Sequence, residues 1–171
     1  MKKQLVWFFF AICFFSVVAS CKKDDEEKDQ RLVNKENKEA GEQFLINNAE
    51  ANRDSVKRTF TGLQYKVNVP STGIRPYPED SVNVTYTGKL IDGTVFASAT
   101  GENMLLVKQI EGILEGLQLM AEKATYTLYI PYYLAYNNSS RTVSYDGKTV
   151  IIQPYSVLIF EITLNSVVRR N

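Results

Sequence analysis

Apolar residues recur at every second position in several segments, and this period constrains the fold more than any other feature of the chain. The first such segment covers 63–69 and ends at Pro70, and the same alternation marks 81–90, 124–130 and 156–168. A period of two is typical of strands that bury one face, and proline ends a strand because it cannot donate a ladder hydrogen bond. The pattern therefore predicts an antiparallel sheet of four to six strands.

One segment between these strands has helical spacing instead. Its apolar residues Ile113, Leu114, Leu117 and Met120 predict a short helix over 110–120. Two glycines inside the segment would weaken this helix if it stood alone, so its apolar face must be covered by the sheet. The expected fold class is α+β, with an antiparallel β-sheet of four to six strands wrapped around one short α-helix.

Two Asp-Gly pairs predict tight turns within this sheet. Asp92-Gly93 follows the strand predicted over 81–90, so a hairpin is expected at that point. Asp146-Gly147 lies inside the segment 137–150 and predicts a second, smaller hairpin. This second hairpin either selects substrates or is a surface loop without a role.

Residues 1–20 have the composition of an export signal. Lys2 and Lys3 precede an apolar run over 5–18, and the small residues Ala19 and Ser20 follow it. The run is shorter than the roughly 20 residues that a membrane-spanning helix needs. Residues 1–20 are therefore predicted to be a cleaved signal peptide.

Cys21 directly follows this signal. The sequence from Val18 to Cys21 resembles the lipobox of bacterial lipoproteins, in which the cysteine thiol is joined to diacylglycerol. The resemblance implies a protein that carries acyl chains such as palmitate and is held at a membrane surface.

A lysine followed by acidic residues after Cys21 resembles a surface-export signal of Gram-negative lipoproteins. The expected location is the Gram-negative cell envelope, with the lipid anchor in the outer membrane, on its periplasmic face or the cell surface. The alternative is an ordinary secretory signal with a chance cysteine.

The next segments connect the anchor to the sheet. Residues 21–34 are polar and charged without an apolar period, which predicts a flexible tether after the lipidated cysteine. Residues 35–59 hold a narrow apolar stripe and no proline, which predicts an N-terminal helix. This helix could dock on the domain, act as a stalk, or pair with a second copy to form a homodimer. The domain itself is expected over 60–171.

Composition excludes several classes of chemistry. The chain has no histidine, and its two cysteines are Cys13 in the signal and Cys21 at the anchor. His-based zinc sites and Ser-His-Asp or Cys-His catalysis are therefore excluded, and no metal or cofactor is expected. The 20 basic and 19 acidic residues nearly balance, so no charge excess points to nucleic acid as a partner.

Four segments resemble the FKBP-type peptidyl-prolyl isomerases, in the order of that family. They are the strand-turn segment 84–96, the central helix 115–120, the pocket loop 130–136 and the closing strand 158–162. The sequence Gly-Leu-Gln-Tyr at 62–65, preceded by a helix, further resembles the macrophage-infectivity-potentiator-like branch of exported isomerases.

The resemblance implies an apolar pocket that takes the prolyl ring of proline-containing polypeptides. It assigns the catalytic positions to Tyr86, Phe96, Ile110, Tyr136 and Phe160. It assigns the substrate-binding positions to Ala97, Met104, Gln109, Ile113, Ile151 and Ile152. The Tyr136 phenol and the Ile110 backbone N–H would donate hydrogen bonds to the bound peptide.

Such a pocket suits prolyl isomerisation because that reaction needs no acid, base, metal or nucleophile. Rotation about the amide bond crosses a barrier of about 18–20 kcal/mol, and the twisted amide is less polar than the planar one. A dry aromatic site therefore favours the twisted state.

The chain departs from the family pattern at four pocket positions. Ala97 stands where the family has an aspartate, Ile113 where it has a tryptophan, Met104 where it has a phenylalanine, and Asn137 where it has a glycine. These changes leave three alternatives open. The protein is an isomerase of exported proteins, a non-catalytic peptide-binding or chaperone lipoprotein with a degenerate site, or a structural lipoprotein with a filled pocket.

Overall fold

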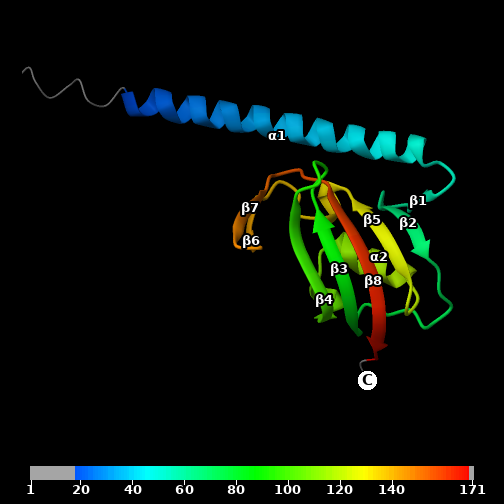
Figure 1. Cartoon of the computed structure of the whole chain (residues 1–171). Coiled ribbons are helices and arrows are strands. Elements are labelled where there is room, and N and C mark those ends of the chain that lie inside the picture. Colours follow the sequence, from blue (N-terminus) through cyan, green and yellow to red (C-terminus); the bar gives the residue numbers. More distant parts are fainter. Residues whose placement is uncertain (1–17, 170–171) are drawn as a thin grey trace, which may run out of the picture. The chain divides into compact units, whose positions relative to one another are not determined.

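A computed structural model describes residues 18–169 and contains one main sheet (Figure 1). Six strands form it in the order β1-β2-β5-β8-β3-β4, and every neighbouring pair is antiparallel. The strands are β1 (Val56–Arg58), β2 (Gln64–Val69), β3 (Ser81–Lys89), β4 (Val95–Leu105), β5 (Thr125–Ile130) and β8 (Leu158–Val168). The predicted α+β class with its antiparallel sheet is confirmed.

A separate hairpin stands beside β4 (Figure 1). It consists of β6 (Arg141–Tyr145) and β7 (Lys148–Ile152). Asp146 and Gly147 join these strands, both with positive φ angles (50° and 69°), as a two-residue turn of the hairpin type requires. The hairpin predicted from this Asp-Gly pair is therefore present.

Helix α2 (Glu111–Leu119) lies against β5 and encloses the core with the sheet (Figure 1). Buried residues alternate along β5, where Tyr126, Leu128 and Ile130 face inward. Each such side chain contributes roughly 1.5–3 kcal/mol when removed from water. The alternation read from the sequence thus marks the face that α2 covers. Two short 3-10 turns, Leu106–Lys108 and Tyr132–Leu134, flank this layer.

The N-terminal helix α1 (Val18–Ala51) differs from the prediction at both ends. The prediction of an irregular tether over 21–34 is wrong at the level of secondary structure, because this stretch is helical. Its lysines, arginine and glutamates are good helix formers, and Glu27 pairs with Arg31 one turn later at 2.7 Å. The predicted helix end at 59 is also wrong, since the chain turns after Ala51 and Val56 pairs with Lys66 of β2.

The chain divides into two compact units after Lys35. Within the unit that begins at Glu36, the second part of α1 packs on the domain. The Phe44 and Tyr129 rings lie 6.2 Å apart, and Asn37 donates a hydrogen bond to the carbonyl of Pro154. Of the three roles left open for the helix, docking on the domain is therefore observed for residues 36–51.

The export signal falls largely outside the described residues. Positions 1–17 of the predicted signal peptide and the side chain of Cys21 are not among them. Within residues 18–169, no helix combines the length and the apolar character needed to cross a bilayer.

Candidate functional site

A cavity of about 570 Å³ opens between the sheet and the N-terminal end of α2. Strands β3, β4 and β8 supply one side, α2 and the turn before it supply the base, and the loop after Leu134 together with β6 supplies the remaining wall. The lining residues are Tyr86, Phe96, Ala97, Glu102, Met104, Lys108, Gln109, Ile110, Ile113, Ala135, Tyr136, Asn137, Arg141, Val143, Phe160 and Ile162.

Aromatic rings form one apolar wall of this cavity. The Phe96 and Phe160 rings meet edge to face with centroids 5.5 Å apart, and the Tyr86 ring lies 5.9 Å from Phe160. Edge-to-face contacts of this kind fix ring orientation as well as excluding water. Ile113, at 5 % exposure, adds an aliphatic side chain from α2. The wall is suited to a flat or puckered apolar ring.

Two hydrogen-bond donors in the lining have no partner within the part of the chain that the structure describes. Ile110 precedes α2 in an extended conformation, so its carbonyl accepts from Ile113 and Leu114 while its N–H is not engaged. The Tyr136 hydroxyl is likewise not engaged, although the Arg141 guanidinium lies 5.2 Å from the Tyr136 ring centre. Both donors are available to a bound peptide.

Asn137 stands where the resemblance leads us to expect a glycine, and its backbone conformation explains why asparagine is accepted there. Its φ angle is 54°, in the left-handed region that asparagine tolerates better than other residues with a side chain. Its backbone N–H donates to Tyr132 at 2.8 Å, and its carbonyl accepts from Tyr155 at 2.7 Å. The loop that carries Tyr136 therefore keeps its turn without glycine.

A bulge in β4 turns a charged residue toward the cavity. Tyr86 pairs with Ala99 and Val84 pairs with Glu102, so one extra residue of β4 lies between these pairs. Gly101 in this bulge has a φ angle of 67°. An extra residue reverses which positions face inward. The Glu102 side chain thus reaches the face that holds Tyr86.

Glu102 and burial together change the acidity of Tyr86. The Tyr86 hydroxyl donates a hydrogen bond to Oε2 of Glu102 at 2.9 Å. Burial, followed by this hydrogen bond and the charge of Glu102, raises the pKa of Tyr86 to about 12. Tyr86 therefore stays protonated at every physiological pH, with its hydrogen directed to the carboxylate.

The structure brings together nine of the eleven site residues expected from the sequence. Ile151 and Ile152, which the resemblance places at substrate-binding positions, are not among the residues that line this cavity. Ile151 lies on the other face of the hairpin from Arg141 and is 50 % exposed, whereas Ile152 is 1 % exposed and belongs to the hydrophobic core. The hairpin presents β6 to the cavity, through Arg141 and Val143.

Sequence reasoning missed the charged members of the lining. Glu102, Lys108 and Arg141 all border the cavity, and none belongs to the apolar pattern from which the site was read. Ile162 was also missed, although it is the next inward-facing residue after Phe160 and alternation alone could have identified it. Ala135 and Val143 are further lining residues that the sequence did not predict.

The fold and the cavity define a class of protein in which an antiparallel sheet packs around one helix and forms a pocket lined in part by aromatic rings. Comparison with known protein families identifies the family within this class. The family model described as FKBP-type peptidyl-prolyl cis-trans isomerase matches residues 73–165. The model for the domain amino terminal to such isomerases matches residues 15–67. The chain belongs to the FKBP-type peptidyl-prolyl cis-trans isomerase family.

Individual relatives agree with this assignment and with the predicted branch. A probable FKBP-type peptidyl-prolyl cis-trans isomerase FkpA of Neisseria meningitidis is 41 % identical over 134 residues, covering 76 % of this chain and 46 % of the relative. The outer membrane protein MIP of Legionella longbeachae is 37 % identical, covering 88 % and 64 %. The crystal structure of FkpA from Escherichia coli superimposes with a TM-score of 0.74 at 28 % identity, covering 87 % of this chain and 67 % of that one. The chain spans about half the length of the first of these relatives.

Proposed function

We propose that the protein is a peptidyl-prolyl cis-trans isomerase that acts on X-Pro bonds of exported or envelope polypeptides. The observation that carries the proposal is the pairing of an aromatic, water-excluding wall with two unengaged donors in one cavity. Phe96 and Phe160 supply the wall, and the Ile110 N–H and the Tyr136 hydroxyl are the donors.

The geometry favours the twisted amide over the planar one. A prolyl ring against Phe96 and Phe160 places its amide bond in an apolar environment, where the less polar twisted form loses less solvation. The Ile110 N–H and the Tyr136 hydroxyl can donate hydrogen bonds to the peptide and hold it in the cavity while the amide bond rotates. Each 1.4 kcal/mol of preference for the twisted state gives roughly a tenfold faster rate.

The proposal is tested by prolyl cis/trans exchange in a short peptide, followed by NMR with the protein from residue 22 onward. Tyr136→Phe removes one donor while keeping the ring, and we expect it to slow the catalysed exchange by about two- to tenfold. Tyr133→Phe is the matched control, because Tyr133 lies in the neighbouring turn but outside the cavity lining.

The outcomes separate the proposed activity from its alternatives. Acceleration that falls in Tyr136→Phe and persists in Tyr133→Phe supports an isomerase with this pocket. Binding of proline peptides without acceleration would instead identify a non-catalytic peptide-binding protein. The third alternative, a structural lipoprotein with a filled pocket, predicts neither binding of proline peptides nor acceleration of exchange.

We further propose that the protein is anchored in the envelope of a Gram-negative bacterium through a lipid on Cys21. The charged start, apolar run and small residues before Cys21 support this location, as does the likeness to a relative named as an outer membrane protein. Growth with labelled palmitate should label the intact protein. The same label on Cys21→Ser would contradict the anchor.

Pairing of the N-terminal helix with a second copy stays a prediction. Leu32 and Val33 on α1 are 54 % and 45 % exposed, so apolar side chains are present for such pairing. A molar mass measured by light scattering decides the matter, since a monomeric mass would exclude the homodimer.

A further inference from the structure

The pocket lacks a carboxylate at the position where its family carries one, and a different carboxylate enters from the same strand. Ala97 faces the cavity without a polar group. Beyond the bulge at Gly101, Glu102 also faces the cavity and accepts the hydrogen bond of Tyr86. The bulge adds one residue to β4 between Ala97 and Glu102. Every side chain after the bulge therefore points to the opposite face from the one its number would predict, and Glu102 lies on the same inner face as Ala97.

We propose that Glu102 is the positioning residue of this pocket, holding the Tyr86 ring in place and supplying the carboxylate that Ala97 lacks. The inference rests on the proposed function, because positioning matters for a rate only if the pocket is catalytic. Tyr86 is the ring that Glu102 acts through, and Phe160 is the ring that Tyr86 meets.

The hydrogen bond divides the roles of the two cavity tyrosines. The Tyr86 hydrogen is committed to Glu102, so the Tyr86 oxygen can accept from a peptide N–H but has no hydrogen left to donate. The Tyr136 hydroxyl has no acceptor among the described residues and stays free to donate. From these two tyrosines, a bound peptide therefore meets one fixed acceptor, the Tyr86 oxygen, and one free donor, the Tyr136 hydroxyl.

Backbone contacts of the bulge fix the place from which Glu102 reaches inward. The Gly101 N–H donates to Oγ1 of Thr85 at 3.2 Å, and Nδ2 of Asn83 donates to the Gly101 carbonyl at 2.7 Å. Both partners belong to β3, the strand that carries Tyr86. β4 carries the Glu102 carboxylate and β3 carries the Tyr86 phenol, and these hydrogen bonds join the two strands at the bulge.

Other charged and titratable groups border the same cavity. Lys108 and Arg141 contribute positive charges, and Tyr136 is the neighbouring phenol. No ion pair joins Glu102 to either cation within residues 18–169, so the hydrogen bond to Tyr86 is the specific contact of this carboxylate. A loss on removing Glu102 would therefore report on Tyr86.

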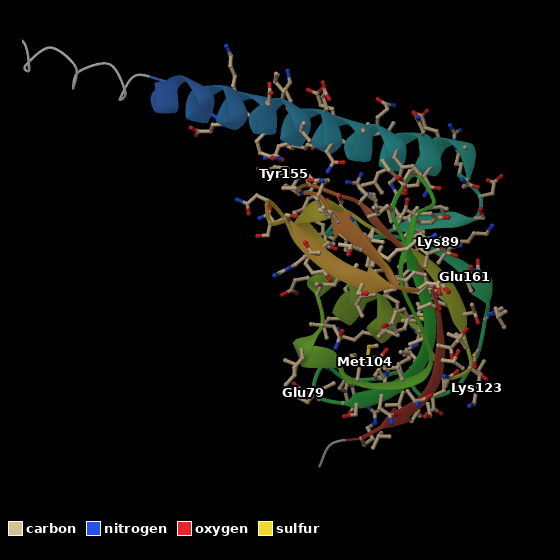
Figure 2. All side chains as sticks on the ribbon, turned by 60° about the vertical axis from the view of Figure 1, so that its left-hand side comes forward. Glu79, Lys89, Met104, Lys123, Tyr155 and Glu161 are labelled. Carbon is tan, nitrogen blue, oxygen red and sulfur yellow. The ribbon has the colours of Figure 1, made fainter. Side chains whose placement is uncertain are left out.

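The test compares Glu102→Ala with a control that removes a carboxylate from the other face of the sheet. Glu161 on β8 is exposed, lies outside the cavity lining and is labelled in Figure 2. We expect Glu102→Ala to slow catalysed exchange about two- to tenfold, as loss of one hydrogen bond at the site predicts. We expect Glu161→Ala to leave exchange unchanged.

Two further measurements distinguish positioning from a general structural effect. In an NMR titration of labelled tyrosine, the pKa of Tyr86, raised to about 12 in part by Glu102, should fall in Glu102→Ala and stay raised in Glu161→Ala. Adding Ala97→Asp to Glu102→Ala returns a carboxylate to the inner face and should restore part of the lost rate.

The outcomes remain informative if the proposed function fails. An unchanged pKa of Tyr86 and an unchanged affinity for a proline peptide in Glu102→Ala would overturn the positioning role, whatever the activity. Absence of exchange catalysis in the unmodified protein would overturn the isomerase instead. The Tyr86 titration and the peptide affinity would then still decide the role of Glu102.

Discussion

Gly116 and Gly112 lie so close to β5 that neither has room for a side chain. A Cβ atom at Gly116 would overlap Cδ1 of Leu128, and one at Gly112 would overlap Cγ2 of Ile130. These glycines weaken α2 as an isolated helix, yet they let it approach the sheet. Packing against β5 thus outweighs helix propensity at both positions.

We expect Gly116→Ala to destabilise the protein by about 1–3 kcal/mol, because overpacking costs more than the roughly 1 kcal/mol that alanine returns in helix propensity. Denaturant unfolding followed by circular dichroism measures the change. Glu111→Ala, at an exposed position of the same helix, should change the free energy of unfolding by less than about 0.5 kcal/mol. An equally stable Gly116→Ala variant would show that α2 can move away from β5.

At the scale of elements, a buried glutamine links α1 to the sheet. Gln64 at the start of β2 is 3 % exposed. Its Oε1 accepts from Nδ2 of Asn48 at 2.8 Å, and its Nε2 donates to the carbonyl of Leu45 at 2.8 Å. Both partners lie on α1, so one side chain satisfies two polar groups of the helix where it meets the sheet.

Gln64→Ala should release this part of α1 more than it affects the rest of the fold. Two half-buried polar groups, Nδ2 of Asn48 and the carbonyl of Leu45, would lose the hydrogen bond to Gln64, which costs at most roughly 1–3 kcal/mol each and less where water replaces the glutamine. Hydrogen exchange should accelerate around Leu45 and Asn48 and stay unchanged in β5. Asn68→Ala, which removes a hydrogen bond between exposed side chains of β2 and β5, is the comparison. Uniform acceleration in both elements would contradict a local link.

The elements that the sequence predicts well are those with an unbroken period. The strands around α2 keep their alternation, and α2 keeps its helical spacing, so their existence follows from burial of one face. The end of α1 was misplaced because no proline interrupts 35–59, whereas the pairing of Val56 with Lys66 is a contact between strands without a local signal. The helical stretch before residue 35 was missed because its described side chains, 27–35, are almost all exposed and give no apolar period, while the pair of Glu27 with Arg31 supports the helix.

The site was predictable to the extent that it follows the family pattern. Phe96, Tyr136 and Phe160 were placed from the resemblance and do line the cavity. Glu102 was not predicted, because a bulge changes the direction of every later side chain without altering composition. Gly101 is the sequence feature that accompanies this bulge, and a single glycine does not specify a bulge.

At the scale of the whole molecule, the absence of histidine removes the usual source of pH dependence near neutrality. The pKa of Asp92 is lowered mainly by the hydrogen bond from the Thr94 N–H, so its stabilisation is complete above about pH 4 and is lost as pH falls through the lowered value. The pKa of Tyr86 is raised to about 12, so its protonated form contributes stability below about pH 10 that is lost as pH rises through the raised value.

Among the side chains that the structure describes, none with a shifted pKa titrates between these limits, so stability and prolyl exchange should both be flat from about pH 6 to 8. Thermal unfolding and NMR exchange at several pH values measure this, with the free amino group of the soluble protein acetylated as a control. A bell-shaped profile in this range would contradict a mechanism that depends on shape and solvation.

The bulge in β4 also bears on how such a pocket is inherited. Successive side chains of a strand point to opposite faces of the sheet, so one added residue moves every later side chain to the other face. A functional group can therefore disappear from one column of a family alignment and return in another while the cavity still contains it. Position 97 alone, where an aspartate is expected and alanine stands, suggests a pocket without a carboxylate, whereas the full set of lining residues includes the carboxylate of Glu102.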